Sequence, residues 1–299
     1  MMKRRKFIAG AAAIFGTAAG SKVLGETSPA DNRKKLERVC VSSWSFHNLF
    51  TSTHDERAPA ISGKPLDILD FPEMVADRYH VHNIEVVSPH FASTETSYLD
   101  GFKRRLARAH SRLVNIPVDY DELWDQPALS ATDPKEREKA VELYTKWIDI
   151  AKELAAPSIR CDPGKVNPDD LSPTIDSYRT LVSRARPQGI HIIVENHGGI
   201  VSKQPELLVK ILKESGAGAL PDFGNFPDEE TREHGLRLLF PLAASICHAK
   251  LRQGKMDFGR CVGISKETGF KGVYSIEAGG QGDPYEAVQQ VRDELIKYL

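Results

Sequence analysis

Short apolar runs alternate with longer amphipathic stretches through most of the chain. These runs predict eight strands, at residues 39–44, 83–87, 113–118, 158–161, 190–195, 219–222, 245–250 and 273–277. Apolar runs with helical segments between them are typical of parallel strands that helices cover. Residues 38–299 are close to the roughly 250 residues of a (β/α)8 barrel, so the pattern predicts an α/β protein with a single TIM-barrel domain. A doubly wound open sheet is the alternative, but no glycine-rich dinucleotide-binding motif follows the first run.

Signals for helix ends support this architecture. Asp133 and Asp283 each precede a proline, a combination that caps a helix and begins it. A third amphipathic segment, 206–215, ends before a glycine, as helices commonly do. The stretches 54–64 and 120–132 have the character of loops, and they are long enough to cover one mouth of the barrel.

Composition places the chain among ordinary globular proteins. Of its 299 residues, 40% are hydrophobic and 8% are aromatic, which excludes a disordered chain. No run of 18 or more apolar residues occurs, so we expect no membrane-spanning helix. The four cysteines form neither a C-x-x-C pair nor a zinc-finger spacing. We expect buried free thiols at Cys40, Cys161, Cys247 and Cys261.

The first 30 residues have the pattern of a leader rather than of a folded segment. Paired arginines, Arg4 and Arg5, precede an apolar stretch rich in Ala and Gly at residues 7–20. This pattern resembles a twin-arginine signal, which implies a bacterial protein that is periplasmic or otherwise exported. The alternative is a basic terminus ahead of a buried helix. Beyond residue 30, 35 basic residues against 40 acidic ones leave a net charge of −5, which argues against nucleic-acid binding.

Four consecutive predicted strands each finish with a side chain that binds metals. They are Glu195, Asp222, His248 and Glu277, and the intervals of 27, 26 and 29 residues match one strand–helix unit each. Since the ends of parallel strands meet at one rim of a barrel, we expect the four side chains to converge. A single Glu is usually a solvated cap and a single His a core residue, but four in register favour a site. Three carboxylates repel one another unless a cation binds, and they suit Mn²⁺, Mg²⁺, Co²⁺ or Zn²⁺.

Other polar side chains are expected around the same mouth. His197 and Lys250 each follow a predicted ligand by two residues and therefore share its face of the strand. For Lys250, a surface cation beyond the strand end is the alternative. Arg160 and Asp162 end the fourth run, and we expect them to pair with each other. The candidate substrate-binding residues are His197, Lys250, His47, Asn225, Glu85 and His90.

The predicted ligands lie within longer motifs that occur in a set order. These are Val194-Glu195-Asn196-His197-Gly198-Gly199, Pro221-Asp222-Phe223-Gly224-Asn225, His248-Ala249-Lys250 and Ser275-Ile276-Glu277. Together they resemble the sugar phosphate isomerase/epimerase family, the xylose isomerase-like TIM barrels, across residues 38–299. The resemblance implies a divalent metal, often Mn²⁺, held by the four residues, and a small-molecule carbohydrate substrate.

The same resemblance implies a mechanism. Glu195 or Glu277 removes a proton beside a ketose carbonyl to give a metal-stabilised enediolate, and the other glutamate returns the proton to the opposite face. Members of the family often form homo-oligomers, so the oligomeric state stays open.

Two departures from the keto-sugar epimerases of this family bear on the substrate. Asn225 stands where these epimerases have a substrate-contacting histidine, and Val201 stands where they have a second glutamate. We expect an isomerase or epimerase of a sugar or keto-sugar derivative. A metal-dependent lyase, hydratase or hydrolase on 3-keto-glycosides is the main alternative, and export favours it. The acidic charge disfavours the related endonuclease IV branch, and the complete ligand set disfavours a non-catalytic sugar-binding barrel.

Overall fold

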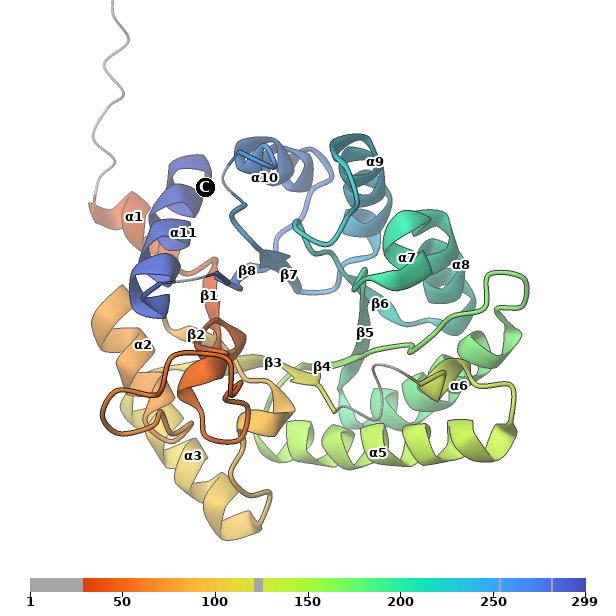
Figure 1. Ribbon diagram of the computed structural model, residues 1–299, viewed down its shortest axis with the longest axis horizontal. Helices are drawn as coiled ribbons and strands as arrows, with labels where there is room; N and C mark the ends of the chain where they lie inside the picture. Colours follow the sequence, from red (N-terminus) through yellow and green to blue (C-terminus); the bar gives the residue numbers. More distant parts are fainter. Residues whose placement is uncertain (1–28, 121–125, 253, 281) are drawn as a thin grey trace, which may run out of the picture.

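Eight parallel strands form the centre of the structure (Figure 1). The computed structural model describes residues 29–120, 126–252, 254–280 and 282–299. The strands are β1 (Val39–Ser42), β2 (Asn83–Glu85), β3 (Arg112–Val118), β4 (Ser158–Cys161), β5 (His191–Glu195), β6 (Gly218–Leu220), β7 (Ile246–Ala249) and β8 (Val273–Ile276). Their order in the sheet is β6-β5-β4-β3-β2-β1-β8-β7, and β1 pairs in parallel with both β2 and β8.

The barrel closes between β6 and β7 through isolated parallel bridges. Asp222 pairs with His248, and Ala219 pairs with Ala243. The His248 amide donates to Pro221 O at 2.9 Å, and the amide that follows Asp222 donates to His248 O at 3.2 Å. Closure therefore brings the backbones of two predicted metal ligands side by side.

Helices form the outer layer around the strands (Figure 1). They are α1 (Pro29–Leu36), α2 (Phe71–Tyr79), α3 (Thr96–Arg108), α5 (Pro134–Glu153), α6 (Ser172–Ala185), α7 (Gly199–Lys203), α8 (Pro205–Ser215), α9 (Glu229–Leu239), α10 (Phe258–Glu267) and α11 (Pro284–Tyr298). Two 3-10 helices, η1 (Ser43–Leu49) and η2 (Ser88–His90), follow β1 and β2. Helix α1 is attached to α11, since Lys35 Nζ donates to Ile296 O at 2.8 Å.

The predicted helix signals act as expected. The Asp133 carboxylate accepts a hydrogen bond from Lys135 N at the start of α5, and Asp283 accepts one from Tyr285 N at the start of α11. Helix α8 ends at Gly216, whose φ of 80° is the left-handed conformation that favours glycine. These caps set where the long helices begin and end against the barrel.

A small apolar cluster is separate from the larger core between the strands and helices. It takes one residue from each of six strands: Cys40, Val114, Ile193, Leu220, Ile246 and Val273. Ile193, Leu220 and Ile246 each stand two residues before a predicted metal ligand. Because strand side chains alternate between faces, the ligands occupy the next inward position above this layer.

The TIM-barrel fold and its eight predicted strands are confirmed. All four cysteines are buried and free, as predicted. The 54–64 stretch contains neither helix nor strand, and His54 and Asp55 are hydrogen-bonded to Asn48 of η1. Within 120–132, residues 121–125 lie outside the described residues, as do residues 1–28 of the predicted leader. In the described part of the chain, no helix has the length and apolar character to cross a membrane.

Candidate metal centre

The four predicted ligands meet at the carboxyl-terminal mouth of the barrel. Glu195 ends β5, His248 lies in β7, and Asp222 and Glu277 follow β6 and β8. One ligand atom of each lies within 4.8 Å of the others. All four are buried, with exposed fractions between 0% and 6%. The sequence therefore predicted this convergence from strand ends alone.

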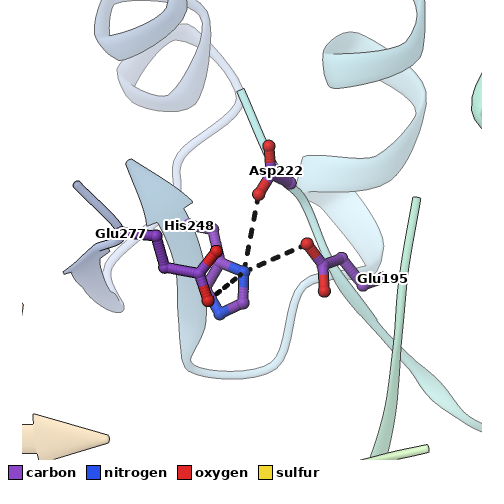
Figure 2. Close-up of side chains that lie close together, drawn as sticks. All are labelled: Glu195, Asp222, His248 and Glu277. Atoms are coloured by element: carbon purple, nitrogen blue, oxygen red, sulfur yellow. Dashed lines mark hydrogen bonds and ion pairs between the residues drawn. The ribbon is translucent and has the colours of Figure 1, made fainter. Parts of the chain in front are cut away.

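One nitrogen of His248 faces all three carboxylates (Figure 2). Its Nδ1 lies 3.1 Å from Glu195 Oε1, 3.3 Å from Glu277 Oε1 and 3.5 Å from Asp222 Oδ2. The four side chains thus present their donor atoms to one small region. Three carboxylate groups and one imidazole are a donor set that divalent cations bind.

Glu85, at the end of β2, orients this imidazole from below. It is fully buried and lies 3.2 Å from His248 Nε2. Its carboxylate also accepts hydrogen bonds from Asn115 Nδ2 and Ser275 Oγ, both at 2.8 Å. A carboxylate on the far nitrogen of a histidine fixes the ring and raises its basicity as a ligand. Glu85 was expected to touch substrate at the mouth, but the structure places it beneath the cluster.

Arg160, in β4, holds the second oxygen of Glu195. Its guanidinium donates to Glu195 Oε2 and to Asp119 Oδ1, and its side chain is only 4% exposed. These contacts replace the expected Arg160–Asp162 pair. Asn225 Nδ2 donates to Glu195 Oε1 at 2.9 Å, so Asn225 also orients this carboxylate. Glu195 is consequently fixed from both of its oxygens.

Lys250 points into the cluster, so the alternative of a surface cation is wrong. Its Nζ lies 2.8 Å from Asp222 Oδ2, 2.9 Å from Glu277 Oε2 and 4.0 Å from Glu195 Oε1. Burial opposes the charge, but Asp222 and Glu277 outweigh it and hold the pKa of Lys250 above its ordinary value. The ammonium is therefore a resident cation of the site.

The pKa values of the two glutamates are shifted in opposite directions. Burial opposes the charge of Glu195, but His248 and Arg160 outweigh it and hold the pKa of Glu195 well below its ordinary value. For Glu277, burial is the stronger effect, and it raises the pKa despite His248 and Lys250. Burial also opposes the charge of His248, whose pKa the surrounding glutamates nevertheless hold well above its usual value. Glu195 is thus the fixed anion, and Glu277 is the carboxyl that takes up a proton more readily.

The residues fit a divalent cation by charge and by distance. The contact network has a net charge of −3 when His248 is neutral. It contains two permanent cations, Arg160 and Lys250, and five carboxylates: Glu85, Asp119, Glu195, Asp222 and Glu277. The buried Asp222 Oδ2 makes ion-pair contacts with Lys250 and His248, but none of its contacts in the described part of the chain has hydrogen-bond geometry. Opposite ligands about 2.1 Å from a cation are about 4.2 Å apart, so the side chains need to close in only slightly.

Two histidines line the wall of the mouth beside the cluster. His47 and His90 lie on η1 and η2, with ring centroids 5.4 Å apart. His90 is 3% exposed, stacks on Phe50 at 3.9 Å and contacts Ser43 Oγ through Nδ1 at 2.8 Å. His47 Nδ1 and His90 Nε2 are buried without a hydrogen-bond partner among the described residues. A hydroxyl-rich ligand would satisfy them.

The remaining mouth residues include two that the sequence analysis did not single out. His197 Nδ1 lies 3.3 Å from Asp162 Oδ2, and its side chain is 26% exposed. Trp44, 36% exposed, lies 5.4 Å from Lys250 Nζ as a cation–π contact. Neither Trp44 nor Asp119 was predicted from the sequence as a site residue. For Asp119, the signal that could have identified it is a polar residue directly after the third strand.

Comparison with solved structures shows that several other proteins share this fold. The D-allulose 3-epimerase of Methylomonas sp. aligns over 88% of this chain and 98% of its own, with a TM-score of 0.67 and 12% identity. A xylose isomerase-like TIM barrel protein from Mycobacterium smegmatis, in complex with magnesium, aligns over 87% of this chain and 96% of its own, with a TM-score of 0.64 and 16% identity. The IolI protein with a bound zinc atom aligns over 88% of this chain and 99% of its own, with a TM-score of 0.66 and 16% identity. Among curated proteins, none matches the sequence.

The fold and the acidic mouth define a TIM barrel with a candidate divalent-metal site. Residues 80–298 match the model of the xylose isomerase-like TIM barrels, about three quarters of the chain. The protein belongs to that family.

Proposed function

We propose that the protein is a divalent-metal-dependent isomerase or epimerase of a sugar or keto-sugar derivative. The convergence of Glu195, Asp222, His248 and Glu277 at the mouth of the barrel carries this proposal. The likeness to the D-allulose 3-epimerase, and to a D-psicose 3-epimerase crystallised with D-tagatose, supports a carbohydrate substrate.

The four residues would hold the cation. When bound, it supplies Lewis-acid polarisation of substrate oxygens, which acidifies the neighbouring C–H groups. We propose Mn²⁺ as the ion, with Mg²⁺, Co²⁺ and Zn²⁺ as alternatives, because the donor set is oxygen-rich with a single imidazole. The likeness to a structure in complex with magnesium and to one with a bound zinc atom supports a divalent ion without selecting among these.

Glu277 is the proposed proton carrier of the reaction. It lies at the mouth, and its raised pKa favours proton uptake from a substrate carbon. In an epimerase, Glu195 is the proposed carrier on the opposite face. It is an anion at rest, so it would return a proton to the substrate only after it has taken one up from the solvent. His197 lies beside Glu195 in sequence and is held by Asp162, so we propose that it binds a substrate hydroxyl. His47, through Nδ1, and Lys250 are proposed to bind further oxygens.

A second candidate is a lyase, hydratase or hydrolase that acts on 3-keto-glycosides. The observation that favours it is the fixation of Glu195 by Arg160 and Asn225. A carboxylate held at both oxygens is a poor proton acceptor, which leaves Glu277 as the main base. Elimination needs only one base to remove the proton and an acid to assist the leaving group, whereas epimerisation needs carriers on both faces.

Proton exchange in D₂O tests the proposal. Metal-loaded protein would be incubated with a panel of ketoses and 3-keto-glycosides and analysed by NMR and mass spectrometry. Deuterium beside the carbonyl with formation of an epimer or isomer supports the first function, and deuterium with loss of an aglycone or water supports the second. Glu277→Gln should abolish exchange, and Glu206→Gln, on the exposed face of α8, serves as the matched control. Absence of exchange with every sugar would contradict both functions.

We further propose that residues 1–30 are a twin-arginine leader and that the protein is exported to the periplasm. The support is the Arg4-Arg5 pair ahead of the apolar stretch. A variant with both arginines replaced by lysine should accumulate in the cytoplasm of a bacterial host, while the unaltered chain reaches the periplasm. Equal distribution of the two would contradict this proposal.

A further inference from the structure

The ammonium of Lys250 occupies the space toward which the candidate metal ligands point. Its Nζ lies 2.8 Å from Asp222 Oδ2, and this is the oxygen that faces His248 Nδ1 at 3.5 Å. It lies 2.9 Å from Glu277 Oε2 and 4.0 Å from Glu195 Oε1. The lysine thus shares an oxygen with the metal-ligand set and neutralises the same carboxylates.

A divalent cation and this ammonium cannot use the carboxylates together without repulsion. Like charges a few ångströms apart in a buried site repel strongly, because little water screens them. The carboxylates that attract one cation attract the other, so the two compete. Lys250 is only 12% exposed, which places the competition inside the protein rather than at its surface.

Besides the carboxylates, the Lys250 ammonium has two further neighbours. The Trp44 ring lies 5.4 Å from Nζ, and Asn225 Oδ1 lies 3.4 Å away. Gly224 lies against the aliphatic part of the side chain: a Cβ at this residue would be 3.1 Å from Lys250 Cδ. The Lys250 side chain has a flexible four-carbon stem, and Trp44 can hold the ammonium by a cation–π contact.

We propose that Lys250 is a displaceable counter-ion: it balances the carboxylates in the metal-free protein and withdraws toward Trp44 when a divalent cation binds. This inference rests on the metal site of the proposed function, but not on its substrate or reaction. Lys250 therefore lowers the affinity for the metal and stabilises the metal-free fold.

Calorimetric titration with Mn²⁺ tests the proposal, with Mg²⁺ and Zn²⁺ as further probes. Lys250→Met removes the charge and keeps most of the stem, and Lys250→Gln is a second neutral variant with a polar end. Lys271→Met makes the same change of charge at an exposed residue before β8, at the opposite end of the barrel. We expect both Lys250 variants to bind Mn²⁺ about tenfold or more tightly than the unaltered protein, and Lys271→Met to bind it equally well.

Thermal unfolding gives a second readout for the same proteins. Without metal, both Lys250 variants should unfold at a lower temperature than the unaltered protein, because the carboxylates lose their counter-ion. With saturating Mn²⁺, this difference should disappear. A variant too unstable to isolate without metal would be purified with Mn²⁺ and titrated by competition with a chelator.

The outcomes separate this inference from the proposed function. If the Lys250 variants bind Mn²⁺ with unchanged or weaker affinity while the unaltered protein binds it, displacement is wrong and the metal-dependent function stands. If only the Lys250 variants bind metal, the competition between Lys250 and the metal is confirmed. The proposed metal-dependent function of the unaltered protein is then wrong. If no protein binds metal, both proposals fail.

Discussion

The buried His90 should make the fold sensitive to mild acid. Burial among apolar groups is the main effect on this imidazole, and with His47 nearby it lowers the pKa of His90 to about 3. In the unfolded chain the pKa is about 6.5. A base whose pKa is lower in the folded state binds protons preferentially when the chain unfolds. Stability is therefore complete above pH 6.5 and is lost as the pH falls from 6.5 toward 3.

The size of this effect follows from the two pKa values. Between pH 7.5 and pH 4.5, the linkage amounts to about 2.7 kcal/mol of the free energy of unfolding, which is a large part of the stability of a typical domain. Other groups also titrate in this range, so the comparison needs a variant without the imidazole. His90→Phe keeps an aromatic ring against Phe50 but has nothing to protonate, and it also loses the hydrogen bond to Ser43.

Urea denaturation of the two proteins at several pH values measures the effect. We expect the unaltered protein to lose about 2.7 kcal/mol more than His90→Phe between pH 7.5 and pH 4.5. His80→Asn is the control, because His80 is exposed and its left-handed backbone suits Asn. This control should follow the unaltered protein. Parallel loss of stability in the unaltered protein and His90→Phe would show that protonation of His90 does not cause the acid sensitivity.

Three further predictions concern the core of the site and the fold. Arg160→Met should lower the free energy of unfolding by about 3–5 kcal/mol in urea, because Glu195 and Asp119 lose their buried cation; an unchanged value would contradict the network. Gly272→Ala should cost about 3 kcal/mol, because its Cβ would lie 2.2 Å from a backbone oxygen, whereas Gly263→Ala, with open space around it, should not destabilise the protein. Mn²⁺ at a hundred times its Kd should raise stability by about 2.7 kcal/mol, and a chelator should reverse this; no change in calorimetry would argue against a folded-state metal site.

The ligands were predictable because each stands at the carboxyl end of its strand or just beyond it, on the inward-facing side. Alternation along a strand is visible in the sequence, and barrel closure brings equivalent ends together. The depth of Glu85 was not visible in the same way. It pairs in register with Ser42 of β1, and its carboxylate reaches the underside of His248. Such depth depends on the stagger between strands, which the sequence does not reveal.

The contacts of Arg160 show a second limit. A buried arginine in an apolar strand signals a carboxylate partner, and the nearest candidate in sequence was Asp162. The actual partners lie at the ends of the neighbouring strands: Asp119 directly follows β3, and Glu195 is the last residue of β5. Partners across strands depend on side-chain length and tilt rather than on sequence distance. The same holds for Lys250, whose inward direction was predictable but whose carboxylate partners were not.

A crystal soaked with Mn²⁺ would show directly whether the four residues at the mouth of the barrel bind a divalent cation. Anomalous scattering would locate the ion and identify its ligands in one measurement. We expect a single strong peak coordinated by Glu195, Asp222, His248 and Glu277, with Lys250 Nζ withdrawn from these carboxylates. A fully soaked crystal with no peak at the cluster, and with Lys250 still among the carboxylates, would contradict this expectation.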